Sequence, residues 1–320
     1  MAGFLLRRGL RALVVLLVLS LLISGLTHIV PGDPATIIAG EQGSPELRAQ
    51  IRAQLGLDRP FLSQYLSWLG NALRGNLGSS LLDGRHVATM IADRLPVSLE
   101  LALMATVLAL LWGVTAGILA ATYHGRFLDA LLNGGSFAGV AVPPFVVGTL
   151  LVLVVSMVAP AWPVLSYVAF GADPVGNLQV MLLPALVLSI PFGAALCRYL
   201  RSSILEIQDQ DFMRTAAAKG ASRRRMILRH ATRNALVPLL TATGLQFGVL
   251  VGGTVIIEQV FGLPGLGSLV VNSIGQHDFP VVQGAILTLG ATYVLLNLVV
   301  DLLYPVVDPR IRAVGAGHGR

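Results

Sequence analysis

The sequence DFMRTAAAKG, residues 211–220, lies within an arginine-rich polar stretch, residues 198–233, that separates two uncharged apolar segments. Aspartate is favoured at helix N-caps, and glycine is favoured just beyond helix ends. The pattern therefore predicts a helix of about two turns over residues 212–219, with Asp211 as its N-cap and Gly220 as its terminator.

Hydrophobic residues make up 55% of the chain and charged residues only 12%, whereas soluble domains carry roughly 25% charged residues. The apolar residues gather in runs of about 20, the length of a helix that crosses the hydrocarbon core of a bilayer. The composition therefore predicts an all-α, polytopic membrane protein. The six predicted transmembrane helices are residues 12–30, 97–122, 137–159, 180–196, 235–257 and 281–300.

The first of these runs could also belong to a cleaved signal peptide, because Arg7, Arg8 and Arg11 precede it. The apolar core of a signal peptide is usually shorter, about 7–15 residues, and a small-x-small cleavage site follows it. The run at residues 12–30 is longer than that, and no such cleavage site follows it. Retention of this segment as a transmembrane helix is therefore favoured.

Basic residues are distributed unevenly between the two sides of the predicted bundle. With the N-terminus inside, most of the 22 lysine and arginine residues lie in cytosolic segments. The short outer loops 160–179 and 258–280 contain none, and the long outer segment 31–96 has as many acids as arginines. Cytosolic loops of membrane proteins carry such an excess of positive charge. Both termini are therefore predicted to be cytosolic, and the net charge of +6 does not indicate a nucleic-acid partner.

This topology divides the chain into four segments. In the second, residues 45–55 and 61–73 have apolar side chains at helical spacing, which predicts a cap folded onto the outer membrane face. The segments are residues 1–30, the cytosolic N-terminus and first transmembrane helix; 31–96, the extracytoplasmic cap; 97–307, a five-helix core that includes the polar loop 198–234; and 308–320, a cytosolic tail.

Glycines recur at four-residue spacing in two spans, at Gly113 and Gly117 in the second and at Gly244, Gly248 and Gly252 in the fifth. In lipid such rows let helix backbones approach closely, because packing drives helix association there. The rows therefore predict tight packing of the bundle. The alternative is a sliding seam that lets the bundle open and close.

A proline pair, Pro143-Pro144, lies inside the third predicted span. Each proline removes a backbone donor, so the span must bend or break there, either as a simple kink or beside a water-lined cavity. Two polar residues, Gln246 and Asn297, also fall inside spans. These four residues are candidates for lining a translocation pathway, although interhelical hydrogen bonds would explain Gln246 and Asn297 equally well.

Three glycines and a proline fall within residues 261–267, next to Glu258 just outside the fifth span. This composition predicts a tight extracytoplasmic turn. Such a turn could form a gate at the solute entrance, or it could simply join two spans. The candidate gate residues are Glu258, Gly262, Pro264, Gly265 and Gly267.

The sequence lacks motifs for catalysis and for metal binding. The only lysine, Lys219, is not in a Gly-x-x-x-x-Gly-Lys-[Ser/Thr] loop that would hydrolyse ATP. The six histidines are scattered, and the single cysteine is Cys197, so neither a zinc pair nor a thiolate cluster is predicted. The chain is therefore not expected to be an enzyme, and a folded basic helix without catalytic machinery is typical of a membrane subunit driven by a partner.

The main alternative is an ion-coupled secondary transporter. Such carriers bury carboxylates near the middle of the membrane, whereas here Glu100, Glu258 and Asp301 all lie at or beyond the ends of predicted spans. A carrier of this kind would also not need the polar loop.

The polar stretch resembles a loop of the inner-membrane permease subunits of binding-protein-dependent ABC transporters, in their dipeptide/oligopeptide/nickel branch. That loop reads Glu-Ala-Ala, three residues, then Gly, and here Arg214-Thr215-Ala216 precedes Gly220 at the same spacing. The family's later Ile-x-Leu-Pro segment is missing, because residues 230–233 read HATR. Further similar motifs are LDRP (57–60), QY (64–65), WL (68–69), GNLG (75–78), RLP (94–96), FGLPGLG (261–267), DLLY (301–304) and DPRIR (308–312).

This resemblance implies a type I ABC importer permease, with six transmembrane helices and a cytosolic coupling helix, in a bacterial inner membrane. The cargo would be a dipeptide, an oligopeptide or a related small solute such as a nickel complex. The implied partners are a second homologous permease, two ABC ATPase subunits that bind ATP and Mg, an extracytoplasmic solute-binding protein and the lipid bilayer. The chain itself would hold no cofactor. Its expected ATPase-coupling residues are Phe212, Arg214, Thr215, Ala216, Lys219 and Gly220.

Overall fold

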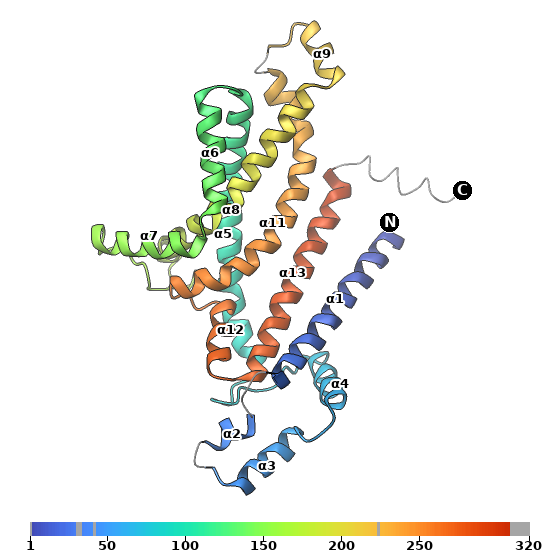
Figure 1. The fold of residues 1–320 in the computed structure, drawn as a ribbon, viewed down its shortest axis with the longest axis vertical. Helices are drawn as coiled ribbons and strands as arrows, with labels where there is room; N and C mark the ends of the chain where they lie inside the picture. The colour runs from blue at the N-terminus through green and yellow to red at the C-terminus, as the bar shows by residue number, and fades with distance from the viewer. Residues whose placement is uncertain (1, 30–33, 41–42, 223–224, 308–320) are drawn as a thin grey trace. The chain divides into compact units, whose positions relative to one another are not determined.

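The computed structural model describes residues 2–29, 34–40, 43–222 and 225–307. Within these ranges every regular element is a helix, which confirms the predicted all-α fold (Figure 1). The predicted tail 308–320 and the arginines at positions 223 and 224 lie outside the described residues. The helices are α1 (Ala2–Ile29), α2 (Pro34–Ala39), α3 (Pro45–Leu55), α4 (Phe61–Ala72), α5 (Val87–Thr122), α6 (Phe127–Ala141), α7 (Pro144–Val158), α8 (Pro174–Gln208), α9 (Asp211–Ala218), the π-helix η1 (Met226–Ala231), α11 (Thr232–Val260), α12 (Leu266–Gly275) and α13 (Phe279–Val307).

Among the described residues, five helices are long and apolar enough to cross a membrane, namely α1, α5, α8, α11 and α13. Helices α5, α8, α11 and α13 contain the second, fourth, fifth and sixth predicted spans, and α1 contains the described part of the first, up to Ile29. Helices α5 and α8 have 36 and 35 residues and are longer than the predicted spans. Each is roughly 50 Å long, so each exceeds a hydrocarbon core of about 30 Å.

The third predicted span, residues 137–159, is not one continuous helix. Helix α6 ends at Ala141, α7 begins at Pro144, and the two meet at an angle of 97°. Val142 and Pro143 both precede a proline, whose ring disfavours the helical conformation of the residue before it. Both residues have extended backbone, with ψ angles of 124° and 131°. The predicted break is therefore confirmed, but it is a corner between two helices.

The chain forms two compact units. Unit 1 comprises Met1–Ser98 and Pro264–Leu295, and unit 2 comprises Leu99–Leu263 and Leu296–Arg320. The apolar core of unit 1 lies between the first turns of α5 and helices α12 and α13. Its buried residues are Val87, Ile91, Leu266, Leu269, Val270, Val281 and Ala285.

Polar contacts join residues around the start of α5 to this core. The buried carboxylate of Asp278 accepts hydrogen bonds from the Ser80 hydroxyl and from the backbone N–H of Leu81, the latter at 3.1 Å. The Ser98 hydroxyl accepts a hydrogen bond from the backbone N–H of Leu266 at 2.8 Å. These contacts join residues far apart in the sequence, so the segment before α5 is folded against the α12–α13 region.

The two short helices predicted for the outer segment are present as α3 and α4. Helix α3 has the predicted bounds, because the Ser44 side chain accepts a hydrogen bond from the backbone N–H of Leu47 and Gly56 ends the helix in the left-handed conformation. Helix α4 begins at Phe61 as predicted and ends one residue early, at Ala72.

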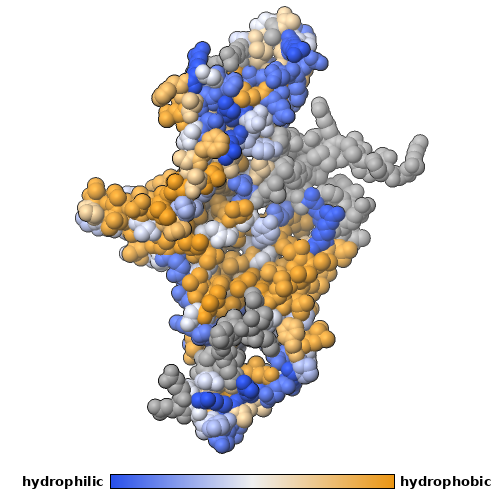
Figure 2. Space-filling model, viewed as in Figure 1, coloured by the Kyte–Doolittle hydropathy of each residue, from blue (hydrophilic) through white to orange (hydrophobic). Residues whose placement is uncertain are grey.

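Helix α8 is the central element of unit 2. Helices α6, α7 and α11 and the π-helix η1 all pack against it, and buried side chains occur along it from Asn177 to Ile204. Figure 2 shows hydrophobic residues over α7 and hydrophilic residues around α9. Unit 2 therefore combines apolar helices with one polar end.

Small residues bring the backbones of α5 and α8 into close contact. A methyl group added at Gly113 would lie 2.5 Å from the carbonyl oxygen of Gly193, and one added at Gly117 would lie 2.9 Å from that of Cys197. The Trp112 indole N–H also donates a hydrogen bond to the Ser189 hydroxyl across this contact, at 3.2 Å. The glycine row in the second span is thus confirmed as a packing surface.

We expect Gly113→Ala to destabilise unit 2, because the added methyl group would collide with a backbone atom of Gly193. Overpacking of this kind costs about 1–3 kcal/mol, and it should lower the midpoint of thermal unfolding of the detergent-purified protein. Gly252→Ala is the matched control, since no described atom lies within 4 Å of a methyl group added there. Equal midpoints for the two variants would contradict this interpretation of the packing.

Candidate functional site

The polar stretch of residues 198–233 is mostly helical. Helix α8 continues to Gln208, α9 follows after two residues, and η1 runs directly into α11. The expected polar loop is therefore a short helix, α9, held between the ends of two long helices. Because α8 and α11 are themselves packed together in unit 2, both ends of the segment are anchored.

Helix α9 begins at Asp211, one residue earlier than predicted. The backbone N–H of Met213 donates to the carbonyl oxygen of Gln210 at 3.0 Å, so Asp211 lies in the first helical turn and the prediction that it is the N-cap was wrong. An acid in the first turn still interacts favourably with the helix dipole. Its ion pair with Arg214, at 3.6 Å, is almost fully exposed and contributes little stability.

One face of α9 is buried and the other is exposed. The Met213 side chain is 3% exposed, and α9 packs against η1. Phe212 is 42% exposed, and Thr215 and Lys219, two further predicted coupling residues, are exposed as well. The structure thus places the predicted coupling residues on an accessible surface, with Ala216 half-buried at its edge.

Gly220 ends α9 as predicted. Its φ angle is +82°, a left-handed conformation that side chains with a Cβ disfavour. The backbone N–H of Ala221 donates to the carbonyl oxygen of Ala216 at 3.2 Å, the bond typical of a Schellman helix ending. The direction in which the chain leaves α9 therefore depends on this glycine.

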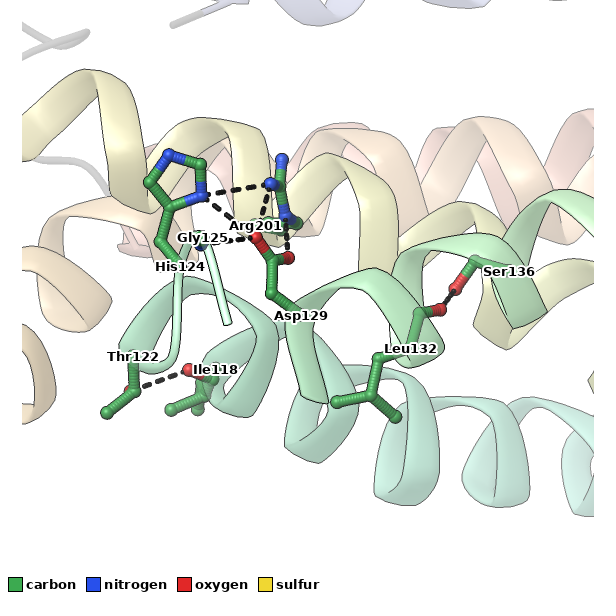
Figure 3. Close-up of polar contacts among 8 residues, drawn as sticks. All are labelled: Ile118, Thr122, His124, Gly125, Asp129, Leu132, Ser136 and Arg201. Carbon is green, nitrogen blue, oxygen red and sulfur yellow. Dashed lines mark hydrogen bonds and ion pairs between the residues drawn. The ribbon is translucent and has the colours of Figure 1, made fainter. Parts of the chain in front are cut away.

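An ion pair between the buried carboxylate of Asp129 and the half-buried guanidinium of Arg201 joins α6 to α8 (Figure 3). The Asp129 carboxylate, whose side chain is 6% exposed, accepts hydrogen bonds from Nε and Nη2 of Arg201 at 2.6 and 2.8 Å. It also accepts a hydrogen bond from the backbone N–H of Gly125 at 3.0 Å. The His124 ring contacts both charged groups through Nδ1, 2.9 Å from Asp129 and 3.1 Å from Arg201.

This cluster was not predicted from the sequence. Asp129 is the only acid between Glu100 and Asp173, and a lone acid at the start of an apolar helix was the available signal. Its pairing with Arg201, 72 residues later, depends on how α6 packs on α8. Removing one partner of a buried ion pair typically costs about 3–5 kcal/mol, because the other charge stays buried.

The candidate pathway residues are spread over several elements. Pro143 and Pro144 form the corner between α6 and α7, and Gln246 lies half-buried on α11. Gly148 of α7 packs against residues 257, 260 and 261 at the end of α11, roughly 16 Å along that helix from Gln246. Asn297 lies half-buried on α13. Their role in a pathway stays a prediction.

The candidate gate residues differ from expectation in two respects. Glu258 lies inside α11 and is fully buried, so it is not just outside the span. The predicted turn 261–267 is also shorter, because α12 begins at Leu266 and Gly267 is therefore helical.

Two of the gate residues belong to unit 2 and three to unit 1. In unit 2, Gly262 has a φ of +62° and the Leu263 N–H donates to the carbonyl of Glu258 at 2.8 Å. In unit 1, Gly265 is the N-cap of α12, and Pro264 precedes it. Gating by these residues stays a prediction.

Met213→Ala should loosen α9, because truncating a buried methionine typically costs about 2–5 kcal/mol. Cleavage by trypsin after Lys219 should become about tenfold faster or more in detergent-solubilised protein, since each 1.4 kcal/mol is a factor of ten in the open population. Phe212→Ala is the control, because that side chain is already 42% exposed. An unchanged rate in Met213→Ala would show that Met213 does not hold α9 in place.

Comparisons with known proteins cover nearly the whole chain. Residues 113–313 match the family model described as binding-protein-dependent transport system inner membrane component, and residues 1–102 match the model of that component's N-terminal part. A protein of Brucella abortus (strain 2308) whose name describes a peptide transport system permease is 42% identical over 312 residues, which cover 98% of this chain and 99% of its own. The glutathione transport system permease protein GsiC of Escherichia coli (strain K12) is 38% identical over 312 residues, with the same coverage.

The fold is also similar to a solved structure. The MetNI methionine ABC transporter, in an inward-facing conformation, matches 68% of this chain and 96% of its own with a TM-score of 0.55. The sequence identity of that match is 16%, so it supports the architecture alone.

Proposed function

This chain belongs to the family of binding-protein-dependent transport system inner membrane components, and we propose that it is a permease subunit of an ATP-driven importer for peptides or a related small solute. Relatives whose names refer to peptide and glutathione transport support this class of cargo. Family membership also removes the reason to retain an ion-coupled carrier as the alternative.

Helix α9 is the observation that carries the proposal. It is a short helix held by Met213 on one side and exposed at Phe212 and Lys219 on the other. An exposed aromatic side chain beside small residues suits insertion into a cleft of a partner. We assign α9 as the coupling helix, with Phe212, Thr215 and Ala216 in the cleft and Arg214 and Lys219 at its rim.

The complete transporter would contain a second homologous permease, two ABC ATPase subunits and an extracytoplasmic solute-binding protein. ATP and Mg would bind to the ATPases, so this chain would contribute no catalytic group. The binding protein would select the solute and deliver it at the outer face. The two permeases would then share the translocation pathway, with Gln246, Asn297 and the Pro143-Pro144 corner as candidates from this chain.

Movement of the ATPases would reach the permease through α9. When ATP binding closes the ATPases, their clefts move, and α9 must move with them. This can switch the permease between inward-open and outward-open states only if the cleft binds the two states with different free energies. A firm attachment of α9 to the rest of the permease is therefore as necessary as its contact with the ATPase.

Gly220→Val tests this proposal. Valine at a φ of +82° is strained by about 1–3 kcal/mol, so the end of α9 should rearrange and ATP-dependent uptake by proteoliposomes should fall about fivefold or more. Gly220→Asn should retain most uptake, because asparagine tolerates the left-handed conformation.

Gly75→Val is the matched control for backbone strain. Gly75 has the same φ of +82° and no described atom within 4 Å of an added methyl group, but it lies in the outer segment. It should leave uptake near the wild-type level at equal protein abundance. Normal uptake by Gly220→Val would contradict the assignment of α9.

The proposed orientation, with both termini in the cytosol, can be tested by cysteine labelling. The native Cys197 is fully buried and should not react with a membrane-impermeant maleimide. Both Asp83 and Lys219 are exposed, and the predicted topology places Asp83 outside the cell and Lys219 in the cytosol. In right-side-out vesicles Asp83→Cys should therefore be labelled and Lys219→Cys should not. Inside-out vesicles should show the reverse. Labelling of Lys219→Cys from outside would overturn the orientation.

A further inference from the structure

One member of the Asp129–Arg201 ion pair, Arg201, lies close in sequence to the coupling helix. Arg201 is on α8, which continues without interruption to Gln208 and is separated from α9 only by Asp209 and Gln210. Seven residues of helix, about 10 Å, therefore connect Arg201 with the end of α8. A displacement of α9 would be passed along this end of α8 to Arg201, as it would be passed through η1 to α11.

On the other side of the pair, Asp129 holds two elements at once. It lies in the first turn of α6, and it also accepts the backbone N–H of Gly125 in the turn between α5 and α6. His124 contacts the pair from the same turn. Whichever tautomer His124 adopts, Nδ1 can either donate to Asp129 or accept from Arg201, so the turn stays bonded to the cluster.

An apolar contact between α6 and α8 lies further along the two helices. Gly139 of α6 faces the side chains of Ile190 and Ala194 of α8, and small-residue contacts of this kind permit a close approach in lipid. Such surfaces allow one helix to slide along the other. Charged hydrogen bonds from two guanidinium nitrogens are directional, so Arg201 can hold Asp129 at only one register.

A second contact follows the same seam. The Arg198 guanidinium lies 4.1 Å from the centre of the Phe137 ring, which places a cation–π contact between α8 and α6. Helix α6 then ends at the 97° corner formed by Pro143 and Pro144. A movement of α6 would therefore carry this corner and the start of α7 with it.

We propose that Asp129 and Arg201 are positioning residues for energy coupling, because their ion pair locks α6 and the α5–α6 turn to α8 so that α9 displaces these elements as one body. The proposal rests on the proposed function, since it assumes that α9 receives the movement of the ATPases. Neither residue touches the solute or the nucleotide in this role. The pair raises the fraction of ATPase movement that is transmitted to the corner between α6 and α7.

A variant that removes both charges separates this role from fold stability. In Asp129→Asn alone, the half-buried Arg201 loses its carboxylate partner, and both stability and uptake should fall. Asp129→Asn/Arg201→Met leaves no unpaired buried charge, and replacing a whole buried pair is often neutral for stability. The thermal midpoint of this double variant should therefore return toward the wild-type value. The ion pair that fixes the register of α6 on α8 is still absent from it.

The measurement is the number of solute molecules imported per ATP hydrolysed, in proteoliposomes that contain the complete transporter and its binding protein. We expect ATP hydrolysis by the double variant to continue while this ratio falls about fivefold or more, the lower end of typical coupling between sites. Arg201→Lys should lower the ratio less, because lysine keeps the charge but loses the two-nitrogen geometry.

Arg85→Gln/Asp93→Asn provides the matched control. It removes an ion pair of 3.0 Å whose side chains are 51% and 58% exposed in unit 1, and it should leave the ratio unchanged. A ratio within about twofold of wild type in the stable double variant, below the usual coupling range, would overturn the proposal while leaving α9 as the coupling helix. A wild-type transporter without ATP-dependent uptake would instead overturn the proposed function itself.

Discussion

Close contact between helix backbones in unit 2 is the constraint on which the rest of the structure depends. Lipid tails are as apolar as the side chains of the helices, so hydrophobic burial does not hold a bundle together inside a bilayer. Contacts such as Gly113 on Gly193 take its place, because they bring whole backbones within van der Waals range. Helix α8 has such contacts with both α5 and α6, and it also carries α9, so the packing that stabilises the bundle also positions the candidate site.

Directional polar contacts complement this packing. The Trp112–Ser189 hydrogen bond and the Asp129–Arg201 ion pair both join α8 to a neighbouring helix. In unit 1, Asp278 similarly binds the segment before α5. A buried polar group is stable only when its partners lie at suitable distances and angles, and each of these contacts therefore selects one arrangement of elements that apolar packing alone would leave free to slide.

Local rules succeeded where the structure is decided locally. The apolar spacing of residues 45–55 predicted the bounds of α3, where the structure has Ser44 and Gly56 as caps. The end of α9 follows from Gly220, because capping involves residues only a few positions apart. The same rules were wrong about Asp211 by one residue. They also missed α12, since the glycines and proline of residues 261–267 indicate a turn but do not show where the next helix begins.

The apolar runs of the sequence, by themselves, determined the helical fold and five of its membrane-crossing segments, because a chain in lipid must satisfy its backbone hydrogen bonds internally. The proline pair determined that α6 and α7 would separate. Only the tertiary structure decided the 97° angle between them, the complete burial of Glu258, and the pairing of Asp129 with Arg201. These features depend on side chains that come from distant parts of the chain, and their contacts exist only after the helices have packed against one another.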